Sequence, residues 1–250
     1  MSGVSRRLKR ILPDGRGVVL AFDHGLEHGP LAYKGIDLSP QRIIGMAGEG
    51  GADAVLLHKG MVREKNLRDV ALIVKLTGKT SLSPVETQSL VSEVENAVAL
   101  GADAVAATIY FNVEDEPAML SQFRGVWSAA REYGLPVIAF AYPRPLPKER
   151  RYKEEFVAPA ARAVAEVGAD IVKTYYTGDG KSWRRVIGGA AAPVLAAGGK
   201  MKEKEAEVLG MVREIMSAGG AGIAVGRNVW ERADGARLLK KIVAIVHERS

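Results

Sequence analysis

The sequence lacks cysteine altogether, since none occurs among its 250 residues. Disulfide bonds, thiolate metal sites and a cysteine nucleophile are therefore excluded. No apolar run reaches the roughly 18 residues that a membrane span needs. The first ten residues, MSGVSRRLKR, are basic but lack the apolar core of a signal peptide. We therefore expect a cytoplasmic protein without a membrane partner.

Signatures of nucleic-acid binding are also missing, although the chain carries a net charge of +6. A positive net charge attracts anions, either nucleic acids or phosphorylated metabolites. The basic residues are scattered, and no nucleic-acid-binding motif accompanies them. We therefore expect a phosphorylated small molecule as the partner and no nucleic acid.

Strong metal-binding motifs are absent as well. The candidate ligands are three histidines, His24, His28 and His58, and two carboxylates, Asp23 and Glu27. Their spacing matches none of the recurring metal motifs, and a lysine nucleophile would make a metal unnecessary. We expect no metal and no cofactor. Asp23 and His24 then stay candidates for acid and base groups or for a structural pair, and Glu27 and His28 for loop residues that bond the backbone.

The chain does contain a repeat. Residues 50–55, 101–105, 168–172 and 219–225 each open with glycine and continue as an apolar run. Glycine at such a place ends a helix in a left-handed C-cap, and the apolar run begins the next buried strand. Each segment therefore marks the joint between a helix and a strand.

Strands and helices alternate along the chain. Apolar runs of strand length begin near residues 18, 53, 72, 104, 137, 171, 193 and 221. Helical periodicity covers residues 40–49, 86–99, 117–133, 155–167, 203–217 and 235–247, with a short helix at 181–189 and a polar, partly helical link at 59–71. This alternation predicts an α/β fold, a single (β/α)8 barrel over residues 1–250. An open doubly wound sheet is the alternative, weakened because no Gly-x-Gly-x-x-Gly follows the first strand.

Polar residues follow these strands, at the end where (β/α)8 barrels carry their active sites. The segments are residues 23–30, 58–60, 77–80, 110–112, 142–144, 173–176, 197–200 and 226–228. A scaffold without a site would not require polar groups at one rim, so we expect the active site there. Tyr142, at one of these ends, is either a packed residue or a proton donor and acceptor facing the site.

A lysine interrupts the apolar strand that begins at residue 171. Burying an ammonium ion without a partner costs several kcal/mol or forces it to lose its proton. A neutral lysine is the nucleophile that Schiff-base enzymes need. Lys173 is therefore a candidate nucleophile, and the alternative is that it points to solvent or pairs with Asp170 or Asp179. Lys75, inside the third strand, is a rival amine.

Glycine and arginine follow the last two strands, where many barrels bind phosphate. Gly198, Gly199 and Gly226 would let backbone N–H groups approach an anion, and Arg227 offers a fork to its oxygens. A helix starting near Trp230 would add its N-terminal dipole. The alternative is that the glycines form tight turns and Arg227 is a surface charge. We favour the phosphate site.

Four motifs support a family resemblance. They are residues 21–30 (AFDHGLEHGP), 141–144 (AYPR), 171–179 (IVKTYYTGD) and 224–228 (AVGRN). Together they resemble the archaeal-type class I aldolases of the DhnA group, and the resemblance covers nearly all of the chain. It implies a (β/α)8 barrel and a large homo-oligomer, often a decamer.

The resemblance also implies a role for each matching residue. Lys173 would form the Schiff base, and Asp23 and Tyr142 would be the acid and base groups. It therefore favours Lys173 over Lys75. Contacts to the substrate and its phosphate are expected from Gly198, Gly199, Gly226, Arg227, Arg144 and His28.

Two branches of the group compete. Residues 27–30 and 75–80 are similar to class I fructose-1,6-bisphosphate aldolase, whereas residues 56–60 and 171–174 are similar to 2-amino-3,7-dideoxy-D-threo-hept-6-ulosonate synthase. Phe140 stands where the aldolase often has tryptophan. We expect cleavage of fructose 1,6-bisphosphate to dihydroxyacetone phosphate and glyceraldehyde 3-phosphate, as in glycolysis and gluconeogenesis. The synthase is the alternative, and a non-catalytic anion-binding barrel is a remote one.

Overall fold

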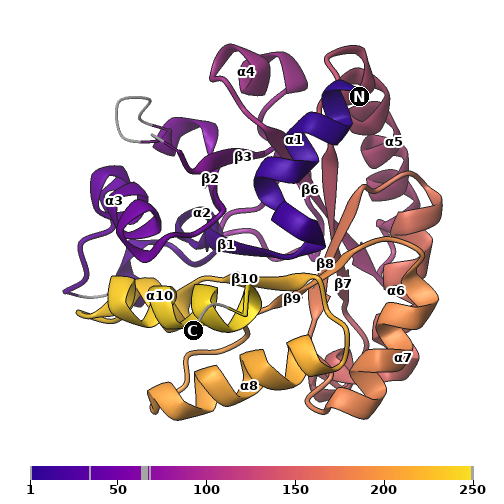
Figure 1. Ribbon diagram of the computed structural model, residues 1–250. Helices are drawn as coiled ribbons and strands as arrows, with labels where there is room; N and C mark the ends of the chain where they lie inside the picture. The colour runs from indigo at the N-terminus through magenta and orange to yellow at the C-terminus, as the bar shows by residue number, and fades with distance from the viewer. Residues whose placement is uncertain (1, 34, 63–66, 68, 249–250) are drawn as a thin grey trace.

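Eight parallel strands form a closed barrel in the computed structural model, which describes residues 2–33, 35–62, 67 and 69–248 (Figure 1). Around the barrel the order is β1, β10, β9, β8, β7, β6, β3 and β2. The predicted (β/α)8 barrel is confirmed, and the open sheet is wrong. The strands are β1 (Gly17–Phe22), β2 (Ala54–His58), β3 (Ala71–Lys75), β6 (Ala104–Phe111), β7 (Val137–Pro143), β8 (Ile171–Tyr175), β9 (Val194–Ala197) and β10 (Gly222–Val225).

Helices surround the barrel (Figure 1). They are α3 (Pro40–Gly50), α4 (Val94–Ala99), α5 (Glu116–Glu132), α6 (Glu154–Glu166), α7 (Gly180–Ala190), α8 (Glu205–Ser217) and α10 (Gly235–Val246). Between β2 and β3, the described residues form only the turn η3 (Lys59–Met61), and residues 63–66 and 68 of the predicted link lie outside the described residues. Within the described part of the chain, no helix is long and apolar enough to cross a bilayer.

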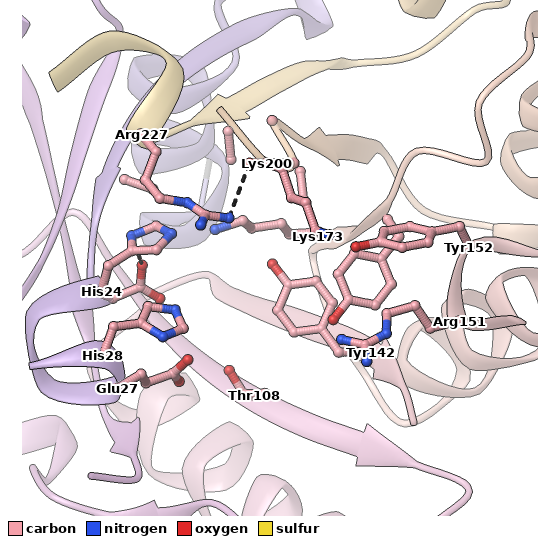
Figure 2. A pocket seen from close by; sticks show the side chains of 18 of the residues that line it. His24, Glu27, His28, Thr108, Tyr142, Arg151, Tyr152, Lys173, Lys200 and Arg227 are labelled. Carbon is pink, nitrogen blue, oxygen red and sulfur yellow. Dashed lines mark hydrogen bonds and ion pairs between the residues drawn. The ribbon is translucent and has the colours of Figure 1, made fainter. Parts of the chain in front are cut away.

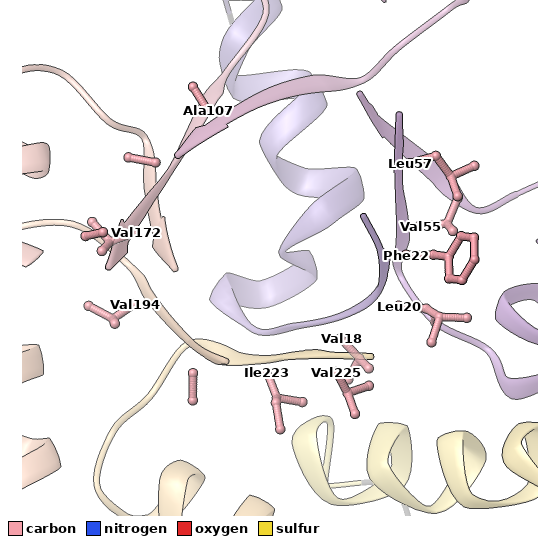
Figure 3. Close-up of a cluster of buried hydrophobic side chains, with 14 of the residues drawn as sticks. Val18, Leu20, Phe22, Val55, Leu57, Ala107, Val172, Val194, Ile223 and Val225 are labelled. Atoms are coloured by element: carbon pink, nitrogen blue, oxygen red, sulfur yellow. The ribbon is translucent and has the colours of Figure 1, made fainter. Parts of the chain in front are cut away.

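Side chains of the barrel strands alternate between two apolar clusters, because successive residues of a strand face opposite sides. Val18 and Leu20 point outward into the helical layer (Figure 3). Val19, between them, belongs to the cluster inside the barrel. A polar residue in phase with the inward positions therefore faces the barrel interior.

An N-terminal helix, α1 (Gly3–Ile11), was not predicted from the sequence. The hydroxyl of Ser2 caps it by accepting the N–H of Ser5 at 3.2 Å. Ile11 is fully buried in the cluster inside the barrel, and Leu12 packs there too. The helix therefore closes the N-terminal end of the barrel, a tertiary role that its basic sequence does not indicate.

The repeated Gly-Ala-Asp joints share one structure at this end. Each aspartate accepts the N–H of a residue near the start of the neighbouring strand and also contacts a histidine or arginine side chain. The backbone pairs are Val18–Asp53, Leu72–Asp103 and Val137–Asp170, at 2.7, 3.0 and 2.7 Å. The side-chain partners are His247, Arg10 and Arg131 respectively. In the fourth joint Gly222 replaces aspartate, because a Cβ there would lie 1.9 Å from the carbonyl oxygen of Gly17.

The helix predicted at residues 86–99 begins only at Val94, so this prediction was partly wrong. The preceding segment forms a hairpin of β4 (Thr77–Gly78) and β5 (Ser89–Leu90). The N–H groups of Val91 and Ser92 both donate to the carbonyl oxygen of Leu76, at 2.8 and 3.1 Å. These backbone groups are used in a tertiary contact, which holds residues 89–92 in a non-helical conformation.

Candidate active site

A cavity of about 370 Å³ lies at the C-terminal end of the barrel (Figure 2). Its lining comes from the ends of six strands and from the segments that follow them. The structure brings all nine predicted site residues to this cavity, while their roles stay predictions. They are Asp23, His28, Tyr142, Arg144, Lys173, Gly198, Gly199, Gly226 and Arg227.

Lys173 lies on β8 in phase with Ile171, which belongs to the interior cluster. Its side chain therefore points into the barrel, and the residue is only 4% exposed. Burial is the main cause that lowers the pKa of the amine. The alternative of a solvent-facing or locally paired lysine is wrong. Asp170 pairs instead with Arg131, and Asp179 caps α7 by accepting the N–H of Ser182 at 2.9 Å.

Lys75 is the second lysine that points into the barrel. It ends β3 in phase with Ile73 and is fully buried. It does not line the catalytic cavity but an adjacent, mainly apolar one, which it shares with Phe22, Leu26 and His58. Of the two rival amines, Lys173 is thus the one beside the predicted phosphate loops.

Asp23 and His24 follow β1 directly. Burial raises the pKa of Asp23, but the nearby Lys173, His24 and Lys75 outweigh this effect and hold it well below its ordinary value. Nδ1 of His24 lies 3.4 Å from Oδ1 of Asp23. Burial lowers the pKa of His24 to about 4, so the ring is neutral at pH 7. The site therefore contains a permanently ionised carboxylate beside a neutral imidazole.

Tyr142 lies on β7 and faces the cavity (Figure 2). Its ring stacks on that of Tyr175, with centroids 4.6 Å apart. Burial and the neighbouring phenol of Tyr175 raise the pKa of Tyr142 well above its ordinary value. The phenol thus keeps its proton at neutral pH and is able to donate it.

Arg144 extends from the end of β7 over the ring of Tyr110, 3.9 Å from the centroid. Its guanidinium also donates to the hydroxyl of Tyr175 and lies 3.4 Å from a carboxylate oxygen of Glu86. Aromatic and acidic contacts fix the side chain, so one cationic wall of the cavity is preorganised.

The loops after β9 and β10 form the opposite wall. Gly199 has a φ of +70°, and a Cβ on Gly226 would lie 2.9 Å from the ring of His24 and 3.0 Å from the carbonyl oxygen of Ala21. Both positions thus require glycine. Nη2 of Arg227 donates to the carbonyl oxygen of Gly199 at 3.4 Å, which holds the guanidinium over the loops (Figure 2).

Asn228 fixes these two loops to each other, a role that was not predicted from the sequence. Its Nδ2 donates to the carbonyl oxygens of Gly198 and Lys200 at 2.8 and 3.0 Å, and its Oδ1 accepts the N–H of Lys202 at 2.7 Å. The helix predicted near Trp230 is the short α9 (Arg227–Trp230), which begins three residues earlier. The glycine loops are therefore held by a buried amide.

His28 and Glu27 lie on the short helix α2 (His24–His28) and both line the cavity. The His28 ring stacks on the ring of His24 at a centroid distance of 5.9 Å. With the described residues, Glu27 forms no hydrogen bond to the backbone, contrary to the alternative considered from the sequence. Its Oε1 accepts Nε2 of Gln88 at 2.9 Å, which links it to the hairpin.

Three lining residues were missed from the sequence. Thr108 lies within β6, in phase with the inward Ala106, so its alternation could have identified it. Arg151 and Tyr152 lie in the turn η5 (Lys148–Tyr152), eight or more residues beyond the strand end. No local pattern marks that turn as part of the site. Over the described ranges, no group of three or more His, Asp or Glu side chains could hold a metal ion.

The site as a whole combines a desolvated amine, an ionised carboxylate, a protonated phenol and two walls with arginine. This arrangement suits attack by an amine on the carbonyl group of an anionic substrate. The chain belongs to the DeoC/LacD family of aldolases, whose model matches residues 17–232. The family resemblance drawn from the sequence is thereby confirmed.

Three proteins illustrate the relationship. A class 1 fructose-bisphosphate aldolase of Thermoproteus tenax is 37% identical over 253 aligned residues, which cover 99% of this chain and 96% of that protein. A crystal structure of an archaeal fructose 1,6-bisphosphate aldolase is 34% identical, with a TM-score of 0.91 over 98% of this chain and 99% of that one. A further archaeal aldolase structure, with its catalytic lysine covalently bound to a carbinolamine intermediate, is also 34% identical over the same shares, with a TM-score of 0.90.

Proposed function

We propose that this chain is a class I fructose-bisphosphate aldolase, a lyase that reversibly cleaves fructose 1,6-bisphosphate through a Schiff base on Lys173. The observation that carries the proposal is a buried amine of lowered pKa in a cavity that also contains the glycine loops and Arg227. The names of relatives at 34–37% identity over nearly the full chain support the substrate.

The reaction begins with the amine of Lys173. Lysine has an ordinary pKa of about 10.4, and burial shifts it toward the neutral form that attacks a carbonyl. The nitrogen adds to C2 of the ketose, and the proton that the nitrogen then loses passes to the former carbonyl oxygen, which gives a carbinolamine. Tyr142, which holds its proton at neutral pH, donates it to the leaving hydroxyl. Water departs and an iminium ion is left.

Cleavage follows because the iminium withdraws electrons. A base removes the proton of the C4 hydroxyl, the C3–C4 bond breaks, and its electron pair forms an enamine. Glyceraldehyde 3-phosphate leaves, the enamine takes a proton at C3, and water hydrolyses the imine to dihydroxyacetone phosphate and free Lys173. The phenolate of Tyr142, which forms when water departs, is suited to remove the proton of the C4 hydroxyl. Asp23 is too weak a base for that, and its fixed charge instead stabilises the iminium.

The two phosphates are assigned to the two cationic walls. Gly198, Gly199, Gly226 and Arg227 would bind the C1 phosphate and hold C2 over the amine. Arg144 and Arg151 would bind the C6 phosphate. Arg227 and Arg151 lie on opposite sides of Lys173 in Figure 2. A substrate with a phosphate at each end matches this arrangement better than a monophosphate.

The deciding experiment is intact-mass analysis after borohydride reduction with fructose 1,6-bisphosphate or dihydroxyacetone phosphate. We expect an adduct on Lys173. Lys173→Ala should lose the adduct and reduce turnover at least about 10⁴-fold, whereas Lys181→Ala, on the exposed start of α7, should retain both. Activity that survives in Lys173→Ala would exclude the Schiff base. No adduct with either sugar would favour the synthase, and phosphate binding without turnover would favour the non-catalytic barrel.

Assembly and location are part of the proposal. We infer a cytoplasmic homo-oligomer, with a decamer as the expected size. Light scattering after gel filtration tests the oligomeric state, and a monomer would contradict the proposal. Several exposed apolar residues of one segment support a surface that another subunit covers. They are Leu82, Val85, Leu90 and Val91, which are 91%, 51%, 46% and 39% exposed.

A further inference from the structure

The reaction described above uses one of the two buried lysines among the described residues, and the other has no part in it. Lys75 is fully buried on β3, and Lys173 is 4% exposed on β8. Both amines lie over the ring of Phe140, at 4.9 and 3.9 Å from its centroid. A fully buried lysine is rare and costly, so its position next to the catalytic cavity calls for a reason.

The polar contacts of the two amines differ. Nζ of Lys75 donates to the carbonyl oxygen of Thr77 at 3.1 Å and lies 3.9 Å from Oδ2 of Asp23. Nζ of Lys173 has neither a hydrogen bond nor an ion pair with any residue that the structure describes. Phe140 offers each amine only a cation–π contact, worth about 0.5–2 kcal/mol. An ammonium ion is therefore stabilised much better at Lys75.

Charge balance leads to the same assignment. Two ammonium ions close to one carboxylate repel each other, and burial strengthens the repulsion. The other cationic candidates are absent at neutral pH, because burial lowers the pKa values of His24 and His58 to about 4. Burial is also the first cause that lowers the pKa values of both lysines. Burial and mutual repulsion thus disfavour the simultaneous protonation of the two amines beside Asp23.

We propose that Lys75 is a positioning residue, the resident ammonium partner of Asp23, and that it thereby leaves Lys173 unprotonated for attack. This inference rests on the proposed function and adds to it the device that keeps the nucleophile neutral. Lys75 acts through Asp23 and its charge, not by touching the substrate, because it lies outside the catalytic cavity.

The ionisable groups that face Lys75 are Asp23 and Glu27 from the β1 side, His58 from β2 and Lys173 from β8. Glu27 also attracts both amines, and its Oε1 accepts a hydrogen bond from the neutral amide of Gln88. Once Lys75 is removed, Asp23 has only Lys173 as an ammonium partner. Lys173 then takes the proton, its pKa rises, and attack at neutral pH becomes slow.

The test is competitive acylation of substrate-free enzyme across pH, with Lys173 followed by peptide mass spectrometry. In Lys75→Met we expect the midpoint for Lys173 to rise by at least about one pH unit. Borohydride trapping of dihydroxyacetone phosphate at pH 7 should then fall at least about tenfold and recover at high pH. Lys181→Met is the matched control and should leave both unchanged. A purely structural role would lower trapping at every pH without moving the midpoint.

A double variant protects the test against misfolding. Lys75→Met with Asp23→Asn lacks the Asp23 carboxylate that would be left without its ammonium partner, and its midpoint for Lys173 should return to the wild-type value or lower. A raised midpoint in the double variant, an unmoved midpoint in folded Lys75→Met, or a wild-type adduct on Lys75 would each overturn the inference. Failure of the wild type to trap either sugar phosphate would count against the proposed function instead, because acylation is measured without substrate.

Discussion

The two ends of the barrel both hold charged side chains, yet they satisfy them differently. At the N-terminal end, Asp170 accepts a backbone N–H at 2.7 Å, and Nη2 of Arg131 donates to both of its carboxylate oxygens at 2.9 Å. At the C-terminal end, Lys173 has no polar partner among the described residues, and Nδ1 of His24 has only the 3.4 Å approach to Asp23. Buried polar groups that have hydrogen-bond partners stabilise a fold, whereas those without partners lower its stability and stay available for chemistry. Stability and chemistry are thus separated along the barrel axis.

Among the substitutions that test this contrast between the two ends of the barrel, the largest effect is expected at Tyr142. Tyr142→Phe removes the proton donor but keeps the ring that stacks on Tyr175, so kcat should fall about 10²–10⁴-fold with little change in KM. The melting temperature should stay the same or rise. Steady-state kinetics against Tyr133→Phe, which alters a half-exposed residue at the end of α5, provide the comparison. A variant with normal kcat would remove Tyr142 from the proton transfers.

Arg227→Gln should weaken binding more than chemistry. The loss of one charge-assisted contact of about 1.5–3 kcal/mol raises KM for fructose 1,6-bisphosphate roughly 10–100-fold. The backbone of the glycine loops should hold its place, because Asn228 fixes it independently. Arg213→Gln on the exposed face of α8 is the control. An unchanged KM would mean that the C1 phosphate does not contact Arg227.

The two ends should also differ in their response to acid. The folded pKa of His24 and His58 is about 4, below the ordinary 6.5. As pH falls through 6.5 the unfolded chain binds these protons first, so the stability that the two neutral histidines contribute is lost between pH 6.5 and about 4. Each histidine accounts for roughly 3 kcal/mol.

The His58→Gln variant tests this expectation at the C-terminal end of the barrel. Urea unfolding between pH 7 and 4 should show a shallower loss of stability in the variant than in the wild type. Equal slopes for the two proteins would mean that His58 titrates normally in the folded state.

The smallest effect is expected at the N-terminal end. Asp170→Ala removes the partner of Arg131 and of the N–H of Val137, so the free energy of unfolding should fall by about 1–3 kcal/mol. Because this site is remote from the substrate, kcat/KM of the folded fraction should equal that of the wild type. A tenfold loss of kcat/KM would break the separation between the two ends.

Much of the fold and of the candidate site could be predicted because it depends on short segments of the sequence. Glycine joints and apolar runs set the strands, and the rule that barrel sites lie at strand ends placed Lys173, Tyr142 and Arg227 together. The prediction of a helix over residues 86–99 was partly wrong because the N–H groups of Val91 and Ser92 donate to the carbonyl oxygen of Leu76. Helical periodicity in the sequence does not reveal such a tertiary hydrogen bond. Arg151 escaped notice because it reaches the cavity from a turn without any local signal.

The sequence by itself therefore determined the alternation of strands and helices, the barrel they close into and the lysine within the sixth barrel strand. Only the tertiary structure decided which charges meet. Lys75 and Asp23 are 52 positions apart in the chain, and their contact at 3.9 Å exists because β1, β2 and β3 lie side by side in the closed sheet. Protonation states follow from such through-space contacts and from burial, neither of which is a property of a local segment.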